Sequence, residues 1–404
     1  MNTFQSICCR AVSVALFLIP SLFIQAQDGF LADTSSVAKG KVIRLRDGSY
    51  YKGETIINLI PNGHGEQVYE SGERYEGEFV KGKRQGEGTC WYADGTRYSG
   101  EWSQNKPNGK GTRWFLNGDR YEGLFTQGII HGFGTMFYAN GDTYLGMWDN
   151  GIRQGNGSYT WDSGNNYSGE WANDHREGTG KFFWQNGSRY EGQWKDNNCS
   201  GKGIFYSPNG DTYTGQWREG LMHGRGKYSF SNGDVYEGEY RNGKRTGTGI
   251  YHYADGNKYD GSFVDGIING TGKYVWACGD VYEGEWTDGL FDGHGTYTAS
   301  DGTSYRGEWH RGQRHGHGIM YDGSTHHRAE GNFINDCIDS YTEYDADGKE
   351  LHTVAGKGLA EEREDDSEWE GEGDPTLEDM MEVSDSTAVV ELSDSLSVDP
   401  LPTY

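Results

Sequence analysis

Five histidines near the C-terminal end are the residues of this chain best placed to do chemistry together. They are His310, His315, His317, His326 and His327. Alternate residues of a strand point to the same side, so His315 and His317 could share a metal ion. No carboxylate or cysteine lies at a spacing that would complete such a site. We therefore predict no metal site and interpret these histidines as surface residues of a repeating unit.

Glutamates recur along the chain and are the next candidates, because a pair of carboxyl groups can act as general acid and base. They include Glu101, Glu170, Glu239, Glu285 and Glu308. A catalytic pair needs at least one carboxyl group in a dry pocket. These glutamates alternate with aromatic residues, which predicts a ladder of carboxylates that faces solvent.

Glycine pairs such as Gly86-Glu87-Gly88 also recur. In a dinucleotide-binding motif a pair of this kind opens a helix, but no helical pattern follows it here. The sequence also has no nucleophile elbow, phosphate loop, metalloprotease helix or paired-cysteine zinc pattern. We predict that the chain is not an enzyme and takes no cofactor.

These residues are held in place by a repeat of 23 residues. Each of its eleven copies contains the triplet Tyr-x-Gly, with a further aromatic residue four positions after the tyrosine. Equal intervals of this kind mean one small unit stacked many times, and therefore an elongated molecule without an enclosed pocket. The positions that we expect to carry the structure include Tyr75, Gly77, Phe79, Tyr98, Gly100, Trp102, Gly109, Gly111, Tyr167, Gly169, Trp171, Tyr213, Gly215, Trp217, Tyr282, Gly284, Trp286, Tyr305, Gly307 and Trp309.

Each repeat is predicted to form two antiparallel strands. Along residues 96–102, polar residues alternate with Tyr, Gly and Trp, which is typical of a half-buried strand. A second strand follows the glycine pair. Asn-Gly and Asp-Gly steps such as Asp94-Gly95 indicate tight hairpin turns in which both residues have positive φ. The other connection, for example residues 80–86, is expected to be longer.

Glycine and aromatic residues share one face of these strands. A ring from a neighbouring strand can then lie over the bare backbone of a glycine. Leu, Ile and Val are scarce at these positions, whereas 14% of the chain is aromatic. We therefore predict that rings seated over glycines, rather than an aliphatic core, hold successive hairpins together.

The fold class that these patterns predict is all-β: an elongated antiparallel β-hairpin meander or solenoid of about 12 units. Two strands per unit, about 4.8 Å apart, give a length on the order of 110 Å. Propeller blades take about 40 residues each, so the shorter period argues against a closed propeller.

The repeat resembles the MORN (membrane occupation and recognition nexus) repeat, whose pattern is Tyr-x-Gly-x-Trp/Phe followed by Gly and then Gly-x-Gly. The resemblance extends over residues 51–333 and implies an elongated, curled β-meander that serves in scaffolding, partner binding or membrane association. In one repeat the matching residues are Tyr98, Gly100, Trp102, Gly109 and Gly111.

Some positions depart from this pattern. The interval from Tyr51 to Tyr75 is 24 residues, and the last repeat has Ala329 in place of tyrosine, shifted by one position. The glycine that usually follows the second aromatic residue is replaced at Asn105, Asp174 and Asn197.

The two ends of the chain differ in character from the array. Arg10 precedes an apolar run at residues 11–24, and Ala26 suits a cleavage site, which predicts a secretory signal. We therefore expect an exported protein that is periplasmic, cell-envelope-associated or secreted. The chain divides into a signal at 1–27, a linker and first strand at 28–50, the repeat array at 51–333, a C-terminal cap at 334–356 and an acidic, disordered tail at 357–404.

The tail has sixteen acidic and two basic residues. This composition is typical of a solvated, disordered segment. We interpret it as a solubilising extension, or alternatively as an arm that binds a basic partner or a divalent cation. A short apolar patch at Val389, Val390 and Leu392 could dock on another protein.

Four cysteines lie beyond the predicted signal: Cys90, Cys199, Cys278 and Cys337. Cys199 and Cys278 are about three repeats, or roughly 30 Å, apart. A disulfide needs Cα atoms within about 7 Å of each other. We predict no intramolecular bridge, whereas pairing between molecules stays open.

Three classes of partner follow from the predicted shape. The first is a protein partner or a second copy of the chain. The second is membrane lipid: the net charge of −25 opposes it, although basic residues lie in the turns along one edge, namely Lys81, Lys83, Arg84, Arg311 and Arg314. The third is an envelope glycan, because aromatic rings can stack on sugars. We expect no nucleic-acid partner.

Overall fold

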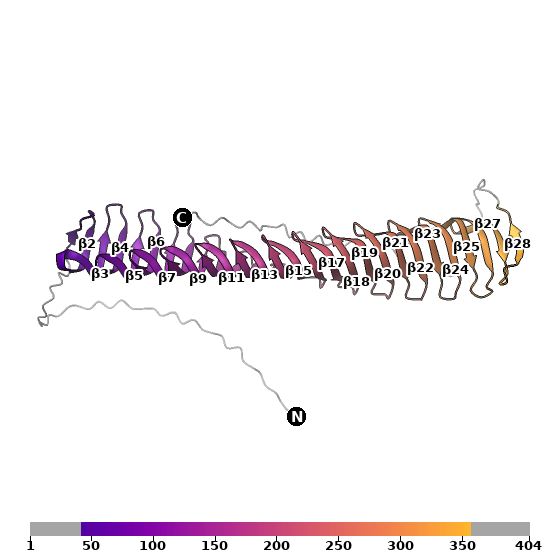
Figure 1. The fold of residues 1–404 in the computed structure, drawn as a ribbon, viewed down its shortest axis with the longest axis horizontal. Helices are drawn as coiled ribbons and strands as arrows, with labels where there is room; N and C mark the ends of the chain where they lie inside the picture. Colours follow the sequence, from indigo (N-terminus) through magenta and orange to yellow (C-terminus); the bar gives the residue numbers. More distant parts are fainter. Residues whose placement is uncertain (1–41, 357–404) are drawn as a thin grey trace, which may run out of the picture.

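The computed structural model describes residues 42–356, and these residues form one antiparallel sheet of 28 strands. Each strand pairs with its neighbours in the sequence, so the chain runs as a single meander (Figure 1). The prediction of an all-β fold built from 23-residue repeats is confirmed, and the sheet is open rather than closed into a propeller.

The elements are β1 (Val42–Arg44), β2 (Tyr50–Ile56), the short 3-10 helix η1 (Ile57–Leu59), β3 (Ile60–Val68), β4 (Arg74–Val80), β5 (Lys83–Trp91), β6 (Arg97–Ser103), β7 (Lys106–Trp114), β8 (Arg120–Thr126), β9 (Ile129–Phe137), β10 (Thr143–Asp149), β11 (Ile152–Thr160), β12 (Asn166–Ala172), β13 (His175–Phe183), β14 (Arg189–Lys195), β15 (Asn198–Tyr206), β16 (Thr212–Arg218), β17 (Leu221–Ser229), β18 (Val235–Arg241), β19 (Lys244–His252), β20 (Lys258–Val264), β21 (Ile267–Val275), β22 (Val281–Thr287), β23 (Leu290–Thr298), β24 (Ser304–His310), β25 (Gln313–Tyr321), β26 (Arg328–Ile334), β27 (Cys337–Tyr344) and β28 (Glu350–Val354).

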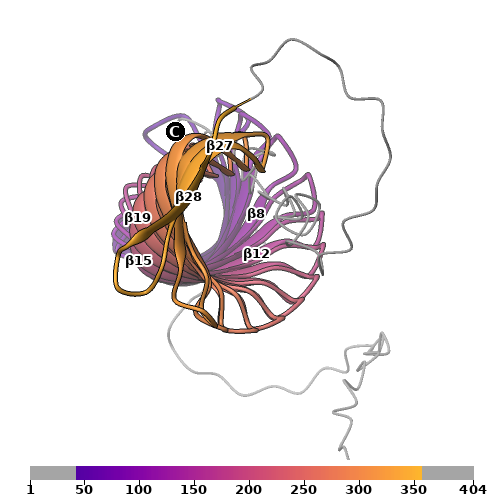
Figure 2. The same cartoon turned by 90° about the vertical axis from the view of Figure 1, so that its right-hand side faces the viewer.

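The sheet is long and twisted. It extends as a rod from β2 at one end to β28 at the other (Figure 1). Viewed along the rod, successive hairpins point outward in different directions, because each strand is rotated relative to the strand before it (Figure 2).

Within a repeat, a strand of seven residues pairs with a strand of nine. Gly77 of β4 lies opposite Gly88 of β5, whereas Phe79 lies opposite Arg84, so β5 has two more residues than β4 between these pairs. This irregularity is a β-bulge, which lets the longer strand bend without losing its register on either side. The bulge recurs in the repeats that follow.

The prediction that residues 80–86 form the longer connection is wrong. Val80 pairs directly with Lys83, so only Lys81 and Gly82 form the turn. Both turn residues have positive φ, at 49° and 80°. Two-residue turns of this kind match the right-handed twist of the strands that they join.

The prediction for the Asp-Gly step is also wrong. Asp94 and Gly95 lie in a five-residue loop between Trp91 and Arg97, which pair with each other. Only Gly95 has positive φ, at 89°. Asp94 instead uses its side chain, whose Oδ1 atom accepts a hydrogen bond of 2.8 Å from the main-chain N–H of Thr96. The Asp is therefore selected for its side-chain acceptor and not for a left-handed backbone.

The replacements at Asn105, Asp174 and Asn197 fall in the two-residue turns. These residues have φ values of 72°, 66° and 68°. Asn and Asp adopt left-handed backbone conformations more readily than other non-glycine residues. The turns therefore keep the geometry of their neighbours without glycine.

Two intervals of the repeat, from Tyr51 to Tyr75 and from Tyr305 to Ala329, are one residue longer than the others, and each extra residue lies in a loop. Between β2 and β3 the turn has three residues, 57–59, where later repeats have two. Between β25 and β26 the loop has six residues, 322–327, where earlier repeats have five. The extra residues leave the glycine and aromatic positions in register.

Several predictions from the sequence lie outside the described residues. These are the signal at 1–27, most of the linker before β1, and the acidic tail at 357–404. Within residues 42–356, no helix has the length and hydrophobicity to span a bilayer.

Candidate interaction surface

One face of the sheet, here called the aromatic face, carries the tyrosines of the repeat and the aromatic residue that follows each of them. Tyr98 meets Trp102 of its own strand and Phe125 two strands later, both edge to face, with ring centres 5.3 and 4.9 Å apart. The same alternation links rings from Tyr51 to Phe333. Edge-to-face pairs contribute about 0.5–1.5 kcal/mol each beyond burial.

Every one of the predicted repeat tyrosines lies on this face and is buried, as are the aromatic residues paired with them. Burial raises the pKa of the Tyr98 hydroxyl well above its ordinary value. That hydroxyl donates a hydrogen bond of 2.9 Å to the carbonyl oxygen of Glu101. The tyrosines are therefore structural and unavailable to a ligand.

Glycines lie directly beneath these rings. A Cβ atom on Gly111 would be 2.3 Å from the hydroxyl oxygen of Tyr98, which comes from the neighbouring strand. A Cβ atom on Gly100 would be 2.4 Å from the Cα atom of Gly111 and 2.9 Å from the same hydroxyl. The ring of Tyr98 in β6 thus covers Gly100 of its own strand and Gly111 of the next strand, β7.

The first glycine of each Gly-x-Gly pair has a different role. Gly109 has φ of 106°, at the β-bulge, where an L side chain would be strained. The bulge leaves the main-chain N–H of Lys110 without a strand partner, and the carboxylate of Glu101 accepts it at 2.9 Å. Glu170 and Glu308 do the same for Thr179 and His317.

The prediction of a ladder of glutamates that simply faces solvent is therefore incomplete. These carboxylates cap the bulges, which explains why Glu or Gln stands at this position in most repeats. An acceptor that satisfies a main-chain N–H in this way typically stabilises the fold by about 1 kcal/mol.

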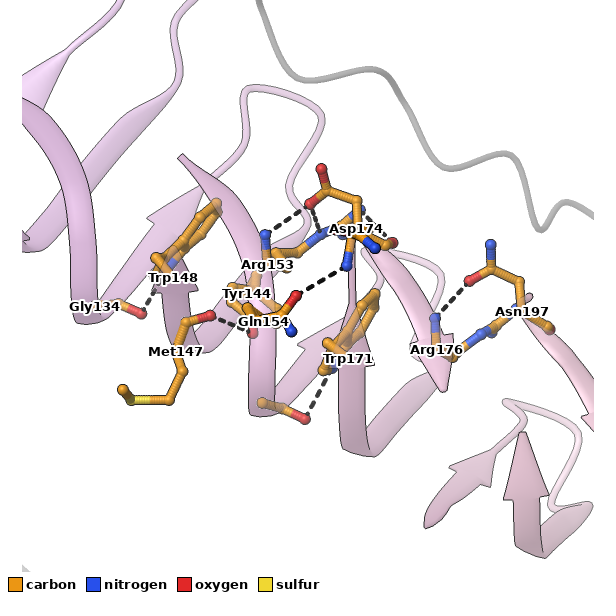
Figure 3. Close-up of polar contacts among 12 residues, drawn as sticks. Gly134, Tyr144, Met147, Trp148, Arg153, Gln154, Trp171, Asp174, Arg176 and Asn197 are labelled. Atoms are coloured by element: carbon orange, nitrogen blue, oxygen red, sulfur yellow. Dashed lines mark hydrogen bonds and ion pairs between the residues drawn. The ribbon is translucent and has the colours of Figure 1, made fainter. Parts of the chain in front are cut away.

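Buried arginines on the aromatic face were not predicted. Arg153 is 3% exposed, and both its main-chain N–H and its Nε atom donate to Oδ1 of Asp174 at 2.9 Å (Figure 3). Its guanidinium lies 4.6 Å from the ring centre of Trp171. The charge is therefore compensated by a carboxylate and an aromatic ring.

Arg176 occupies the same position one repeat later but faces an amide. Its main-chain N–H donates to Oδ1 of Asn197, and Nη2 donates to the Asn197 carbonyl oxygen, both at 2.8 Å (Figure 3). Its Nε and Nη1 atoms are buried and have no hydrogen-bond partner within the described part of the chain. Burial lowers the pKa of Arg176 to about 10.

Two of the five basic residues that we assigned to an exposed edge are not exposed. Arg84 is 8% exposed, contacts Tyr75 and Trp102, and forms an ion pair with Glu73. Arg314 forms an ion pair with Asp336 at 3.1 Å. The basic clusters in the turns are therefore smaller than the sequence indicated.

The cysteines and histidines form no reactive cluster in the described region. Cys90 and Cys199 are buried, Cys278 and Cys337 are exposed, and none of the four is bridged within residues 42–356. His310 and His315 have ring centres 5.8 Å apart. The same residues contain no group of three or more side chains placed to hold a metal ion.

The opposite face, here called the polar face, exposes the main chain of a row of glycines, on each of which an added Cβ atom would point to the aromatic face. Every strand from β2 to β25 places a glycine opposite a glycine of the next strand, so that the row runs along the rod as far as β26. Open depressions lie over this row. One is bordered by Lys110, Leu124 and Phe133, and a second, five repeats later, is bordered by Arg225, Glu239 and Thr248.

The first depression adjoins a group of exposed apolar side chains. We name Leu124, Phe133, Leu145 and Met147 the apolar patch; they are 37%, 54%, 46% and 42% exposed. Met147 lies directly opposite Phe133 across β9 and β10. The Met147 side chain points away from Tyr144 and Trp148 (Figure 3).

The apolar patch was also missed from the sequence. Leu124 and Met147 occupy the bulge-capping position where Glu101 and Glu170 stand in the flanking repeats. Neither side chain has an oxygen atom that could accept a hydrogen bond from the bulge. The signal was therefore present in the sequence, because two successive repeats carry an apolar residue at a position that is polar in the other repeats.

Comparison with protein families matches the MORN repeat eleven times in succession. The matched residues are 75–97, 98–120, 121–143, 144–166, 167–189, 190–212, 213–235, 236–258, 259–281, 282–304 and 305–325. These repeats make up more than half of the chain, which therefore belongs to the MORN repeat family. Repeats of this family serve as scaffolds and commonly mediate protein or membrane interactions.

Comparison with curated proteins gave no match. Among solved structures, the TCP domain of Drosophila melanogaster SAS-4, in complex with a proline-rich motif of Ana2, is 16% identical with a TM-score of 0.23, over 44% of this chain and 85% of that one. A variant of the Danio rerio CPAP TCP10 domain is 13% identical with a TM-score of 0.19, over 60% and 97%. A streptogramin B lyase is 11% identical with a TM-score of 0.12, over 68% and 92%. Scores this low carry no argument about function.

Proposed function

We propose that this chain is an exported, non-catalytic scaffold that binds a protein partner through its polar face. The observation that carries the proposal is the division between the two faces. The aromatic face repeats the same buried rings and glycines, so it is committed to packing. The polar face presents different side chains at equivalent positions, such as Phe133 and Thr248, along the row of glycines.

A protein partner fits these features better than an anionic membrane does. Attachment to anionic lipid relies on clusters of exposed Lys and Arg. Arg84 and Arg314 are engaged with Glu73 and Asp336, which leaves few basic side chains free at the turn edge.

A glycan partner is likewise less well supported. Stacking on a sugar needs an accessible ring face, and the rings of the repeat are buried against one another and against glycine. Several aromatic residues of the polar face are covered by an arginine, whose guanidinium lies 4.4 Å from the ring centre of Trp91, 3.9 Å from that of Trp114, 4.4 Å from that of Phe137 and 4.0 Å from that of Tyr206.

Export is proposed from the sequence alone. The basic residue, apolar run and small residue within 1–27 form the pattern of a secretory signal. Mass measurement of the protein recovered from the envelope or medium tests this proposal. A mature chain that begins near Gln27 supports it, and an intact N-terminus in the cytoplasm contradicts it.

Partner binding is tested with the mature chain carrying photo-crosslinking residues on each face. Capture from the native envelope fraction should yield one defined protein from polar-face positions such as Thr179 and Thr248, and none from buried aromatic-face positions. Two further assays test the alternatives: liposome pelleting tests lipid binding, and quenching of tryptophan fluorescence by wall fragments tests glycan binding. Pelleting or quenching without any protein adduct would replace the proposal with lipid or glycan binding.

A further inference from the structure

The apolar patch breaks the pattern of the polar face, and its size limits what can cover it. A stable interface between two folded proteins buries roughly 800 Å² on each partner. Four side chains that are each about half exposed offer much less than this. The patch therefore fits a short extended segment better than the flank of a second rod.

Charge further restricts the occupant. On both sides of the patch the equivalent position holds a carboxylate, Glu101 before it and Glu170 after it. Leu124 and Met147 remove the carboxylates from this position over these two repeats. Lys110 borders the depression, and the one carboxylate that also borders it, Glu122, forms an ion pair with Arg120 at 3.3 Å. This stretch of the face can therefore accept a segment that carries both apolar and acidic residues. In the flanking repeats, Glu101 and Glu170 would repel the acidic residues of such a segment.

One segment of the chain itself has this chemistry. Residues 388–398 read Ala-Val-Val-Glu-Leu-Ser-Asp-Ser-Leu-Ser-Val, with apolar side chains at the alternate positions 388, 390 and 392 and again at 396 and 398. Alternation of this kind gives an extended segment one apolar edge. Asp394 interrupts this apolar edge and Glu391 lies on the opposite edge, so Asp394 is the acidic residue that suits the depression bordered by Lys110.

We propose that residues 388–398 dock on the apolar patch formed by Leu124, Phe133, Leu145 and Met147. Docking of this kind goes beyond binding of a separate partner and does not depend on it, because the segment belongs to the same chain. It covers apolar surface on the polar face and places the tail in competition with any ligand for the depression above Gly123 and Gly134.

The tail is long enough for this contact. From β10 to β28 there are eighteen strand steps of about 4.8 Å, roughly 86 Å along the rod. Thirty-two residues lie between Gly356 and Val389, and an extended chain over these positions spans about 110 Å. The segment can therefore reach the patch of its own molecule, and also that of a copy lying alongside.

The test places a photo-crosslinking benzoylphenylalanine at Phe133 in the full chain, with the same residue at Thr179 as the matched control. Thr179 is the equivalent position two repeats later. We expect adducts from position 133 to map to residues 384–404, at least about fivefold above the yield from position 179, because a tether keeps the segment at high local concentration. Monomeric and dimeric adducts distinguish docking within a chain from docking between chains, and both support the proposal.

Three outcomes would overturn the proposal. They are equal yields from the two positions, no adduct with the tail, and an adduct that joins position 133 to residues 124–147 of a second copy. A second measurement guards against failure of the probe. Leu124→Glu with Met147→Glu restores the residue of other repeats and should raise the rate of proteolysis within 388–398 about fivefold in the full chain. An unchanged rate, with the array still folded, also counts against docking.

Discussion

Two regions of the rod, five repeats apart, show what the repeat holds constant and what it leaves free. Around β8 and around β18, the aromatic face is the same: Tyr121 and Tyr236 are both fully buried. On the polar face the same two regions differ, with Leu124 and Phe133 in one and Glu239 and Thr248 in the other. Packing over glycine therefore constrains one face of each strand, while the other can change its chemistry without changing the fold.

The largest expected effect comes from breaking the constant face. Gly111→Val would place a Cβ atom 2.3 Å from the hydroxyl oxygen of Tyr98, so the ring must leave its seat. We expect a loss of about 3 kcal/mol or more in the free energy of unfolding, measured by chemical denaturation. Thr112→Val is the matched control, one residue along on the polar face, and should change stability by less than about 0.5 kcal/mol. Equal losses of stability in the two variants would show that packing constrains the aromatic face no more than the polar face.

Alkaline pH attacks the same face throughout the rod. Burial raises the pKa of Tyr75, Tyr144 and Tyr236 above the ordinary value of 10.0. Because the folded-state pKa is raised, the stability contributed by each neutral hydroxyl is fully present below pH 10 and is lost as the pH rises above it. We expect tyrosinate absorbance and loss of circular dichroism to rise together in one steep transition. Ionisation of these tyrosines with an intact sheet would contradict the account.

A smaller effect is expected where adjacent repeats differ within the aromatic face. Asn197→Asp gives Arg176 the carboxylate that Arg153 has in Asp174, and should stabilise the protein by about 1–2 kcal/mol at neutral pH. The gain should disappear in acid, as the new carboxyl group is protonated. Asp174→Asn is the reverse exchange and should destabilise by a similar amount. Thermal unfolding measures both changes in stability. Changes of the same sign in the two variants would contradict the proposed compensation of the arginine charge by a carboxylate.

The smallest expected effect lies on the variable face. Leu124→Glu supplies an acceptor for the bulge at Phe133, as Glu101 does for Lys110, and should raise stability by about 0.5–1 kcal/mol. Glu101→Leu is the converse change and should lower it by the same amount. A fall in stability on Leu124→Glu would mean that the leucine packs as part of the fold rather than as an exposed contact.

The sequence predicts the constant face well because a single physical rule is repeated. A tyrosine, a glycine two residues on and a further aromatic residue are enough to specify a strand, its buried side and the residue that it covers. The antiparallel pairing follows, since a meander is the simplest path for such short connections. Rings over glycines, such as Tyr98 over Gly111, hold successive strands as expected.

The turns were assigned the wrong way round because Asp-Gly has two uses. In Asp94-Gly95 the Asp caps Thr96 and only the Gly is left-handed, whereas Lys81-Gly82 forms the two-residue turn without any such signal. Sequence alone does not separate these cases, because both put glycine at a positive φ.

The buried arginines and the apolar patch escaped prediction for a related reason. Arg84 stands between Lys83 and Gln85 in a polar stretch, and only the bulge shows that it points to the aromatic face. Leu124 and Met147 belong to β8 and β10, which also carry buried aromatic rings. An extra apolar residue in such a strand is read as part of the core until the side to which it points is known.

Hydrogen–deuterium exchange of the full chain tests the division between the two faces most directly. The variant to compare with the parent carries Leu124→Glu, Phe133→Thr, Leu145→Ser and Met147→Glu, which are the residues found at these positions in the repeat at 167–189. We predict unchanged protection throughout β4–β25 and exchange about fivefold faster within residues 388–398. Loss of protection across β7–β12, or unchanged exchange of the tail, would contradict the account.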